Sequence, residues 1–144
     1  MNNIVIRNIH NDDINKNIIN LLNQLSNTQN IQKHLFLQFI KTLNNNHQII
    51  VIEDTLNNNI VGIGTILIEQ KIIHNMGKVA HIEDIVIDKN YRKRGLANNL
   101  LNKLKNIAIN NKCYKIILNC NENLKMFYNK NGFTQKNIQM AIYF

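Results

Sequence analysis

The 144-residue sequence has no proline, no tryptophan, only two cysteines and fewer acidic than basic residues. No apolar run approaches the length that spans a bilayer, and the N-terminus lacks the apolar core of a secretory signal peptide. With no proline, linker or repeat to mark a boundary, residues 1–144 are predicted to form one domain. We expect a soluble, cytoplasmic protein with no membrane partner.

The two cysteines, Cys113 and Cys120, have no second pair beside them and no histidine pattern typical of a zinc site. A disulfide framework is not indicated, which favours a reducing compartment. We therefore expect reduced thiols and no bound metal.

The charge balance is strongly basic, with 17 lysines and arginines against nine acids, a net charge of +8 and a pI near 9.6. This field favours anionic partners, either nucleic acid or small phosphorylated molecules. Aromatic residues make up only 6% of the chain, which leaves few platforms for base stacking. The hydrophobic fraction of 44% is sufficient for a buried core.

Alternating or continuous apolar segments predict strands, and apolar stripes at helical spacing predict helices. Asparagine supplies about a fifth of the chain, and its clusters at residues 44–46 and 57–59 are typical of loops. Asp12 or Asp13 is positioned to cap the first helix. The predicted strands cover residues 4–9, 47–54, 60–69, 82–87, 115–120 (fully buried) and 137–144, and the helices begin near residues 13, 31, 96 and 124. Their order predicts an α/β domain with a mixed, partly parallel central sheet flanked by helices.

The most informative segment is HIEDIVIDKNYRKRGLA, residues 81–97, in which an apolar strand carrying two acids runs into a basic turn that opens an amphipathic helix. The first turn of a helix leaves its N–H groups without partners and its dipole end positive, so it attracts anions. Arg92, Lys93 and Arg94 add full charges there, and Gly95 lets the backbone approach a bulky ligand. This combination predicts a pyrophosphate site.

The RKRGLA turn resembles the Arg/Gln-x-x-Gly-x-Gly/Ala signature with which GNAT acyltransferases hold coenzyme A. Further segments resemble, in order and spacing, the glucosamine 6-phosphate N-acetyltransferases of that superfamily over most of residues 60–144, while the first third matches loosely. These segments are IEQKIIH, HIEDIVI, CYKIIL, FYNKNGF and IQM. The resemblance implies the GNAT fold, acetyl-CoA as co-substrate, a homodimer, and conversion of glucosamine 6-phosphate to N-acetylglucosamine 6-phosphate for UDP-N-acetylglucosamine synthesis.

Acetyl transfer to an amine needs removal of a proton from the amine, a polarised carbonyl and a proton for the leaving thiolate. Glu83 and Asp84 are neighbours on a strand, so their side chains should point to opposite faces. We expect Glu83 to face the sugar and help to take the amine proton, directly or through water, and Asp84 to support it. The alternative for each acid is a simple ion pair with lysine or arginine.

The resemblance also implies the groups that hold acetyl-CoA. Backbone groups of Ile85, Val86 and Ile87 would bind the pantetheine arm like an added strand, with the N–H of Ile85 as oxyanion donor and the isoleucine side chains in the core. Tyr128 would protonate the leaving thiolate; the alternative is simple aromatic packing beside Phe127. The other expected cofactor contacts are Arg92, Lys93, Arg94, Gly95, Leu96, Ala97, Asn98 and Asn123. Asn123 departs from the family pattern, because relatives have the asparagine where Leu124 stands.

For the sugar phosphate, the resemblance implies contacts from Lys71 and His74, which would meet the phosphate, and from Ser26, Glu83 and Asp84. Asn119 and Cys120 occupy the place of an Asp-Cys pair that contacts the sugar, so the acid is missing. Tyr143 stands where many relatives have an arginine that reaches the sugar phosphate of the partner subunit. The alternative for Lys71 and His74 is an ordinary surface role, and the alternative for Ser26 is a loop hydroxyl or a cap.

Two other functions compete with this interpretation. A GNAT enzyme acting on a protein or polyamine amine keeps the fold and co-substrate, but the matches at residues 71–74 and 119–120 argue against it. A non-catalytic basic binding module would be expected to have lost Glu83, Tyr128 or the RKRGLA turn, and all three are present. We therefore expect a small-molecule acetyltransferase that does not bind nucleic acid.

Overall fold

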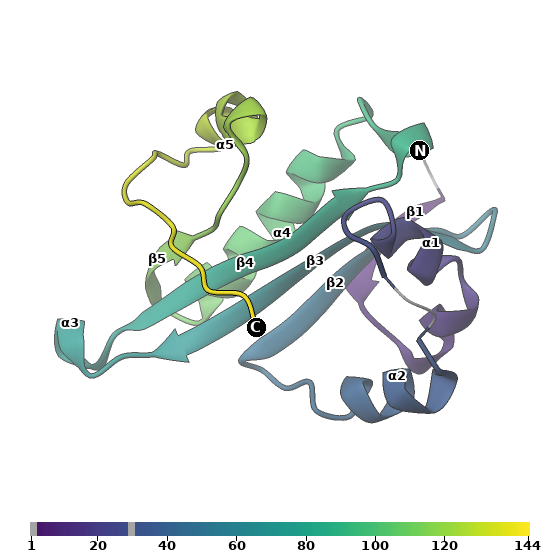
Figure 1. The fold of residues 1–144 in the computed structure, drawn as a ribbon, viewed down its shortest axis with the longest axis horizontal. Coiled ribbons are helices and arrows are strands. Elements are labelled where there is room, and N and C mark those ends of the chain that lie inside the picture. Colours follow the sequence, from purple (N-terminus) through teal and green to yellow (C-terminus); the bar gives the residue numbers. More distant parts are fainter. Residues whose placement is uncertain (1–2, 29–30) are drawn as a thin grey trace.

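The computed structural model describes residues 3–28 and 31–144 and contains a five-stranded mixed sheet with helices on both faces (Figure 1). The predicted α/β architecture is confirmed. Within the described ranges, no helix is long and apolar enough to cross a membrane. In chain order the elements are β1 (Ile4–Asn8), η1 (Asn11–Asn15), α1 (Ile18–Leu22), α2 (Lys33–Ile40), β2 (His47–Asp54), β3 (Asn59–Gln70), α3 (Ile73–Met76), β4 (Lys78–Ile87), η2 (Lys89–Tyr91), α4 (Leu96–Asn110), β5 (Cys113–Ile117), η3 (Glu122–Leu124) and α5 (Lys125–Lys130).

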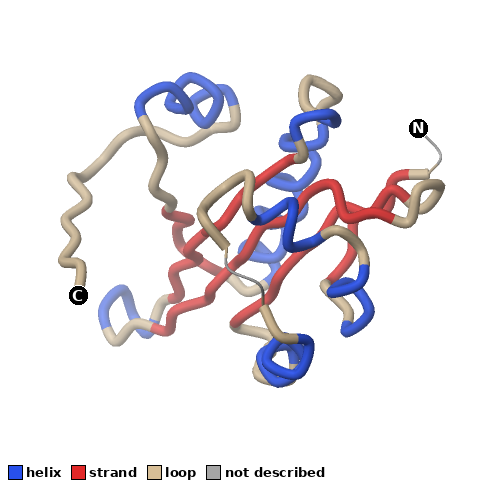
Figure 2. Tube along the Cα trace, turned by 45° about the vertical axis from the view of Figure 1, so that its right-hand side comes forward, coloured by secondary structure: helices blue, strands red, loops and turns tan. Residues whose placement is uncertain are grey.

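The strands lie in sequence order, β1-β2-β3-β4-β5. The first four pair antiparallel, and β5 pairs parallel to β4 after a crossover through α4. The tube in Figure 2 shows α4 packed across the strands on one face of the sheet. The basic turn of residues 92–95 thus connects a central strand to the crossover helix, which is where the sequence placed it.

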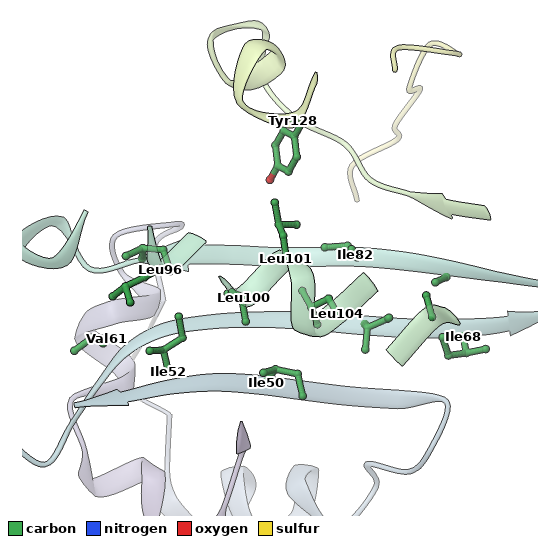
Figure 3. Packing of buried hydrophobic residues seen from close by; sticks show 14 residues of the cluster. Ile50, Ile52, Val61, Ile68, Ile82, Leu96, Leu100, Leu101, Leu104 and Tyr128 are labelled. Carbon is green, nitrogen blue, oxygen red and sulfur yellow. The ribbon is translucent and has the colours of Figure 1, made fainter. Parts of the chain in front are cut away.

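Two apolar clusters cover the two faces of the sheet. Figure 3 shows the stripe of α4 lying on β2, β3 and β4, with Leu100, Leu101 and Leu104 fully buried as predicted. On the other face, Ile18 and Leu21 of α1 and Phe36 of α2 pack against the strands. Burial on both faces explains the continuous apolar run Ile49–Ile52 in the middle of β2 and the largely apolar run of residues 60–68 in β3.

A β-bulge interrupts β4 at the pair of acids. Glu83 is opposite Thr65 and Val86 is opposite Ile63, so Asp84 and Ile85 together face one residue of β3. Asp84 has a left-handed φ of 53°. The bulge interrupts regular alternation directly after Glu83, because Asp84 and Ile85 share one position opposite Gly64; that the two acids point to opposite faces stays a prediction.

The first helix differs from its prediction. A 3₁₀ helix at Asn11–Asn15 is separated from α1 by Asn17, which is left-handed with a φ of 59°. Neither Asp12 nor Asp13 is the capping residue, which is His10. The Asp13 carboxylate accepts a bond from the His10 N–H, and its main partner is Arg7 at 2.7 Å. The Asp13 carboxylate therefore binds Arg7 and the His10 N–H instead of capping a longer helix.

Two strand predictions near the C-terminus are also wrong. β5 spans Cys113–Ile117 and is half exposed, because it is an edge strand with a neighbour on one side only. Residues 133–144, predicted to end in a strand at 137–144, have no regular secondary structure. A strand needs a hydrogen-bonding neighbour, and the sheet of the described chain pairs none with this segment. Its large apolar side chains are exposed: Ile138, Met140, Ile142, Tyr143 and Phe144.

Candidate functional site

The turn between β4 and α4 has a backbone suited to holding an anion. Lys93 and Gly95 are both left-handed, with φ of 62° and 77°. The first helical bond of α4 runs from the Asn99 N–H to the Gly95 carbonyl. By helix geometry, the N–H groups of residues 96–98 are therefore directed out of the helix end. Alternating backbone signs and a helix N-terminus together form a concave cluster of donors.

The charges on this turn are available for a ligand. Arg92, Lys93 and Arg94 are exposed, and none of them takes part in an ion pair among the described residues. The Nε of Arg92 donates to the Ile87 carbonyl at 3.0 Å, and Nη2 of Arg94 donates to the Asn90 carbonyl at 2.9 Å. Both side chains are thus tied to backbone acceptors while their charge remains uncompensated.

The segment just before this turn, residues 88–91, contacts a residue that the sequence did not single out. The Gln24 amide donates to Asp88 at 2.8 Å and accepts from the Lys89 N–H at 2.9 Å. Asp88 also accepts from the Asn90 N–H at 2.8 Å. A contact across 64 residues leaves no local signal in the sequence. These bonds join the segment after α1 to the start of η2, just before the basic turn.

One edge of β4 is open beside the turn. Pairing with β5 ends at His81 opposite Ile117, and residues 82–87 have no strand partner on that side in the described part of the chain. Val86 and Ile87 are buried, and Ile85 packs half-buried against the α4 cluster, as expected for core side chains. The backbone rather than the side chains of this segment is available to a ligand.

Glu83 and Asp84 lie at the bulge that opens this edge. Glu83 is half-buried and next to Ile82, which packs with the α4 cluster, so Glu83 lies on the opposite face. Asp84 is exposed. Neither carboxylate has a hydrogen bond or ion pair within the described ranges, so the ion-pair alternative finds no support there.

Tyr128 lies on α5, beyond the open edge. Its ring packs edge-on against Phe127 at 5.1 Å and Phe133 at 5.8 Å, and it belongs to the α4 cluster. Figure 3 shows its hydroxyl pointing toward Leu101 and the sheet. Burial raises the pKa of Tyr128 above its usual 10, and the Cys120 thiol adds to the shift. The phenol therefore keeps its proton at neutral pH.

A pocket of about 330 Å³ lies between the end of β5, α5 and the C-terminal segment. Asn119, Cys120 and Tyr128 line it together, so this part of the predicted site is assembled within one chain. Asn123 of η3 is exposed and does not line the pocket, whereas Asn98 at the start of α4 accepts a bond from Asn131 at 3.2 Å. That bond links the basic turn to the end of α5.

The other predicted acceptor residues are dispersed. Lys71 and His74 lie at the β3–β4 tip, and Glu83 comes five positions after Lys78 along β4, roughly 16 Å away along the strand. Lys71 pairs with Glu69 at 2.5 Å, and the His74 ring stacks on Tyr114 at 4.4 Å. The two remaining residues, Ser26 after α1 and Tyr143 in the C-terminal segment, are exposed. Within one chain, Lys71 and His74 therefore lie away from Glu83.

The chain was compared with known families, sequences and structures. The sequence model of the acetyltransferase (GNAT) family matches residues 16–133. The chain is 37% identical to glucosamine 6-phosphate N-acetyltransferase 1 of Oryza sativa subsp. japonica, covering 92% of this chain and 82% of the rice protein. It is 38% identical to glucosamine 6-phosphate N-acetyltransferase 1 of Dictyostelium discoideum, covering 92% and 85%.

The fold agrees with these relatives. The crystal structure of glucosamine-6-phosphate N-acetyltransferase from Arabidopsis thaliana superimposes with a TM-score of 0.93 at 35% identity, covering 98% of both chains. The likeness thus includes the first third of the chain, where the motifs matched loosely. The chain belongs to the GNAT acetyltransferase family and, within it, to the glucosamine 6-phosphate N-acetyltransferases.

Proposed function

We propose that this protein transfers the acetyl group of acetyl-CoA to the amine of glucosamine 6-phosphate, giving N-acetylglucosamine 6-phosphate and coenzyme A by direct attack in a ternary complex. The observation that carries the proposal is the open edge of β4, residues 82–87, which leads directly into the anion-binding turn. The names of the rice, Dictyostelium and Arabidopsis relatives support this acceptor.

The residues present fit coenzyme A. The turn offers left-handed Lys93 and Gly95 with three uncompensated cations, which suits a pyrophosphate. A Cβ built on Gly95 would meet no protein atom within 4 Å, so the space in front of the turn is open to a ligand. The pyrophosphate would be held by residues 92–98, and the pantetheine arm would run along Ile85, Val86 and Ile87, with Asn123 as a further contact.

When bound, acetyl-CoA supplies an activated acyl carbonyl and a thiolate leaving group. The chain supplies three groups around it. Glu83 takes the proton of the amine, directly or through water. The N–H of Ile85, in the bulge and without a β3 register partner, stabilises the oxyanion. Tyr128 holds a proton on its hydroxyl, which its raised pKa keeps in place, and passes it to the departing sulfur.

The acceptor half of the site is assigned to Lys71 and His74 for the phosphate, and to Ser26, Asp84, Asn119, Cys120 and Tyr143 for further contacts. Lys71 is held by Glu69, and Tyr143 is 93% exposed. Lys71 and His74 need a closing loop or a second subunit to meet at Glu83. Their dispersion therefore supports a site completed by the partner of a dimer.

The homodimer has independent support in the C-terminal segment. Ile138, Met140, Ile142 and Phe144 occur at every second position, which is the spacing of one strand face, and each is at least 81% exposed. An apolar strand-like segment without a neighbour is a surface for another chain. We assign it to the second subunit of a cytoplasmic homodimer.

The acceptor is tested by thiol release from acetyl-CoA over a small panel of amines: glucosamine 6-phosphate, glucosamine, spermidine and a peptide with a free N-terminus. We expect the sugar phosphate to give the highest kcat/KM, and glucosamine to be poorer through KM because it lacks the phosphate. If spermidine or the peptide reacts and glucosamine 6-phosphate does not, the proposed acceptor is wrong while the GNAT chemistry stands.

A further inference from the structure

We propose that Asp54 and Tyr91 are positioning residues that hold the pyrophosphate turn in its binding conformation. Asp54 ends β2, and Tyr91 is the residue immediately before Arg92. Neither residue belongs to the matched signature, and neither is placed near the acetyl group. The proposal rests on the proposed use of coenzyme A.

The Asp54 carboxylate is buried, at 6% exposure, and is surrounded by neutral donors. The Tyr91 hydroxyl donates to its Oδ2 at 2.6 Å, and the Asn57 side-chain amide donates to the same oxygen at 2.7 Å. The N–H groups of Leu56 and Asn57 donate to Oδ1 at 3.1 and 3.4 Å. A short O–H···O⁻ bond of this kind is among the stronger hydrogen bonds in proteins.

The same tyrosine supports the charged end of the turn. The Tyr91 N–H donates to the Asp88 carbonyl at 2.8 Å, which closes η2. The guanidinium of Arg94 lies 4.9 Å above the Tyr91 ring, in the range of a cation–π contact. Tyr91 therefore holds this segment through three contacts: its hydroxyl binds Asp54, its ring packs under Arg94 and its N–H binds the Asp88 carbonyl.

The arrangement also keeps the cations available. Asp54 is an anion close to a basic segment, yet it forms no ion pair in the described part of the chain, since neutral donors occupy both its oxygens. An acid that bound Arg94 directly would compete with the pyrophosphate for the same charge. The phenol separates the two, linking the acid on its hydroxyl side to the arginine on its ring face.

The proposal predicts an effect confined to the nucleotide end of coenzyme A. Pantetheine lacks the pyrophosphate, so its contacts along residues 85–87 do not depend on the turn. We expect Tyr91→Phe, which removes only the hydroxyl, to weaken coenzyme A binding by roughly tenfold, the scale of a hydrogen bond to a charged group. Tyr91→Leu, which also removes the ring under Arg94, should weaken it further. Pantetheine affinity should be unchanged in both.

The experiment measures coenzyme A binding by calorimetry and pantetheine binding by NMR titration, with thermal unfolding of each variant recorded alongside. Tyr114→Phe at the start of β5 is the matched control and should leave coenzyme A affinity unchanged. The double variant Asp54→Asn/Tyr91→Phe should lose less than the product of the two single losses, because both break one bond.

Equal losses for coenzyme A and pantetheine in Tyr91→Phe, or no loss for coenzyme A, would overturn the proposal. Both readouts are independent of the sugar phosphate, so an error in the assigned acceptor leaves this test intact. If coenzyme A fails to bind the unsubstituted protein at all, the failure belongs to the proposed function rather than to Tyr91.

Discussion

The two ends of β4 are organised in opposite ways. At its C-terminal end, the basic turn and the segment before it are tied to Gln24, Asp54 and the Ile87 carbonyl, and the turn leads into the longest helix among the described residues. At its N-terminal end, the β3–β4 tip carries exposed Ile72, Ile73 and Met76 and two of the residues assigned to the phosphate. The difference teaches that contacts within one chain hold the basic turn in place, whereas Lys71 and His74 at the other end of β4 lie away from Glu83.

The largest effect is expected where the two halves meet, at Tyr128. Tyr128→Phe keeps the packing against Phe127 and Phe133 and removes the hydroxyl, which forms no hydrogen bond with the described residues. We expect kcat to fall by roughly 10²-fold or more, the usual contribution of a general acid, with little change in the melting temperature. Steady-state kinetics with glucosamine 6-phosphate measures this.

The pH profile identifies the role. Because the pKa of Tyr128 is raised above 10, the phenol is protonated through neutral pH, and its loss of a proton can reduce kcat only at strongly alkaline pH. The unsubstituted enzyme should show that alkaline limb, and Tyr128→Phe should lack it. A variant with unchanged turnover across pH would leave Tyr128 with a packing role alone.

The next effect tests whether the acceptor half needs a second subunit. Replacing Met140, Ile142 and Phe144 together with serine removes most of the exposed apolar stripe, leaves both core clusters untouched and spares the lining of the Tyr128 pocket. We expect the dimer dissociation constant to rise by roughly a hundredfold or more, since each apolar side chain buried contributes ~1.5 kcal/mol or more. Sedimentation measures it.

Activity should follow the oligomeric state in that variant. Acetyl transfer should fall as the dimer dissociates, while coenzyme A binding, which we assign to residues of one chain, should stay unchanged. A variant that is monomeric and fully active would show that the acceptor residues assemble within one chain. If the unsubstituted protein is itself monomeric and active, the proposed dimer is wrong.

The features that were predicted correctly from the sequence are those whose residues lie close together along the chain. The stripe from Leu96 to Ala108 and the glycine turn before it are contained in one continuous segment, so α4 and its N-terminus were predicted correctly. The bulge at Asp84, the break at Asn17 and the contact between Tyr91 and Asp54 depend on partners elsewhere in the chain. The C-terminal segment alternates like a strand, and alternation alone does not supply a neighbouring edge.

A smaller effect is expected at Gly95, in the basic turn. Its φ of 77° is a conformation that a β-branched residue adopts only with strain, and the open space in front of it is assigned to pyrophosphate. We expect Gly95→Val to weaken coenzyme A binding by roughly tenfold, the effect of ~1–2 kcal/mol of backbone strain, and to leave sugar-phosphate affinity much less changed.

Gly132 provides the matched control for that variant. It has a φ of 88° and, like Gly95, no protein atom within 4 Å of a built Cβ, but it follows α5 instead of preceding α4. Gly132→Val should therefore carry similar strain with little effect on coenzyme A affinity measured by calorimetry. Equal losses in the two variants, or equal losses of both ligands in Gly95→Val, would remove the pyrophosphate assignment from the turn.

The smallest effect concerns Glu69 at the β3–β4 tip. Its carboxylate pairs with Lys71 at 2.5 Å and with His81 at 2.9 Å, and the hydrogen bond from Lys71 is the main cause that lowers the pKa of Glu69. The acid is therefore ionised at neutral pH and competes with any phosphate for the lysine. Glu69→Gln removes the competing charge and should lower the KM for glucosamine 6-phosphate by roughly twofold, the scale of an exposed pair.

Measuring the KM for glucosamine, an acceptor without a phosphate, shows whether the change in Glu69→Gln depends on the phosphate. Glucosamine has no phosphate for Lys71 to meet, so its KM should not change in Glu69→Gln. Asp12→Asn, which removes one exposed acid in η1, is the charge-matched control and should change neither value. Higher salt should shrink the difference between Glu69→Gln and the unsubstituted enzyme, because exposed charges are screened. A KM that falls equally for both acceptors would mean that Lys71 does not bind the phosphate, and the assignment of the β3–β4 tip to the acceptor site would be wrong.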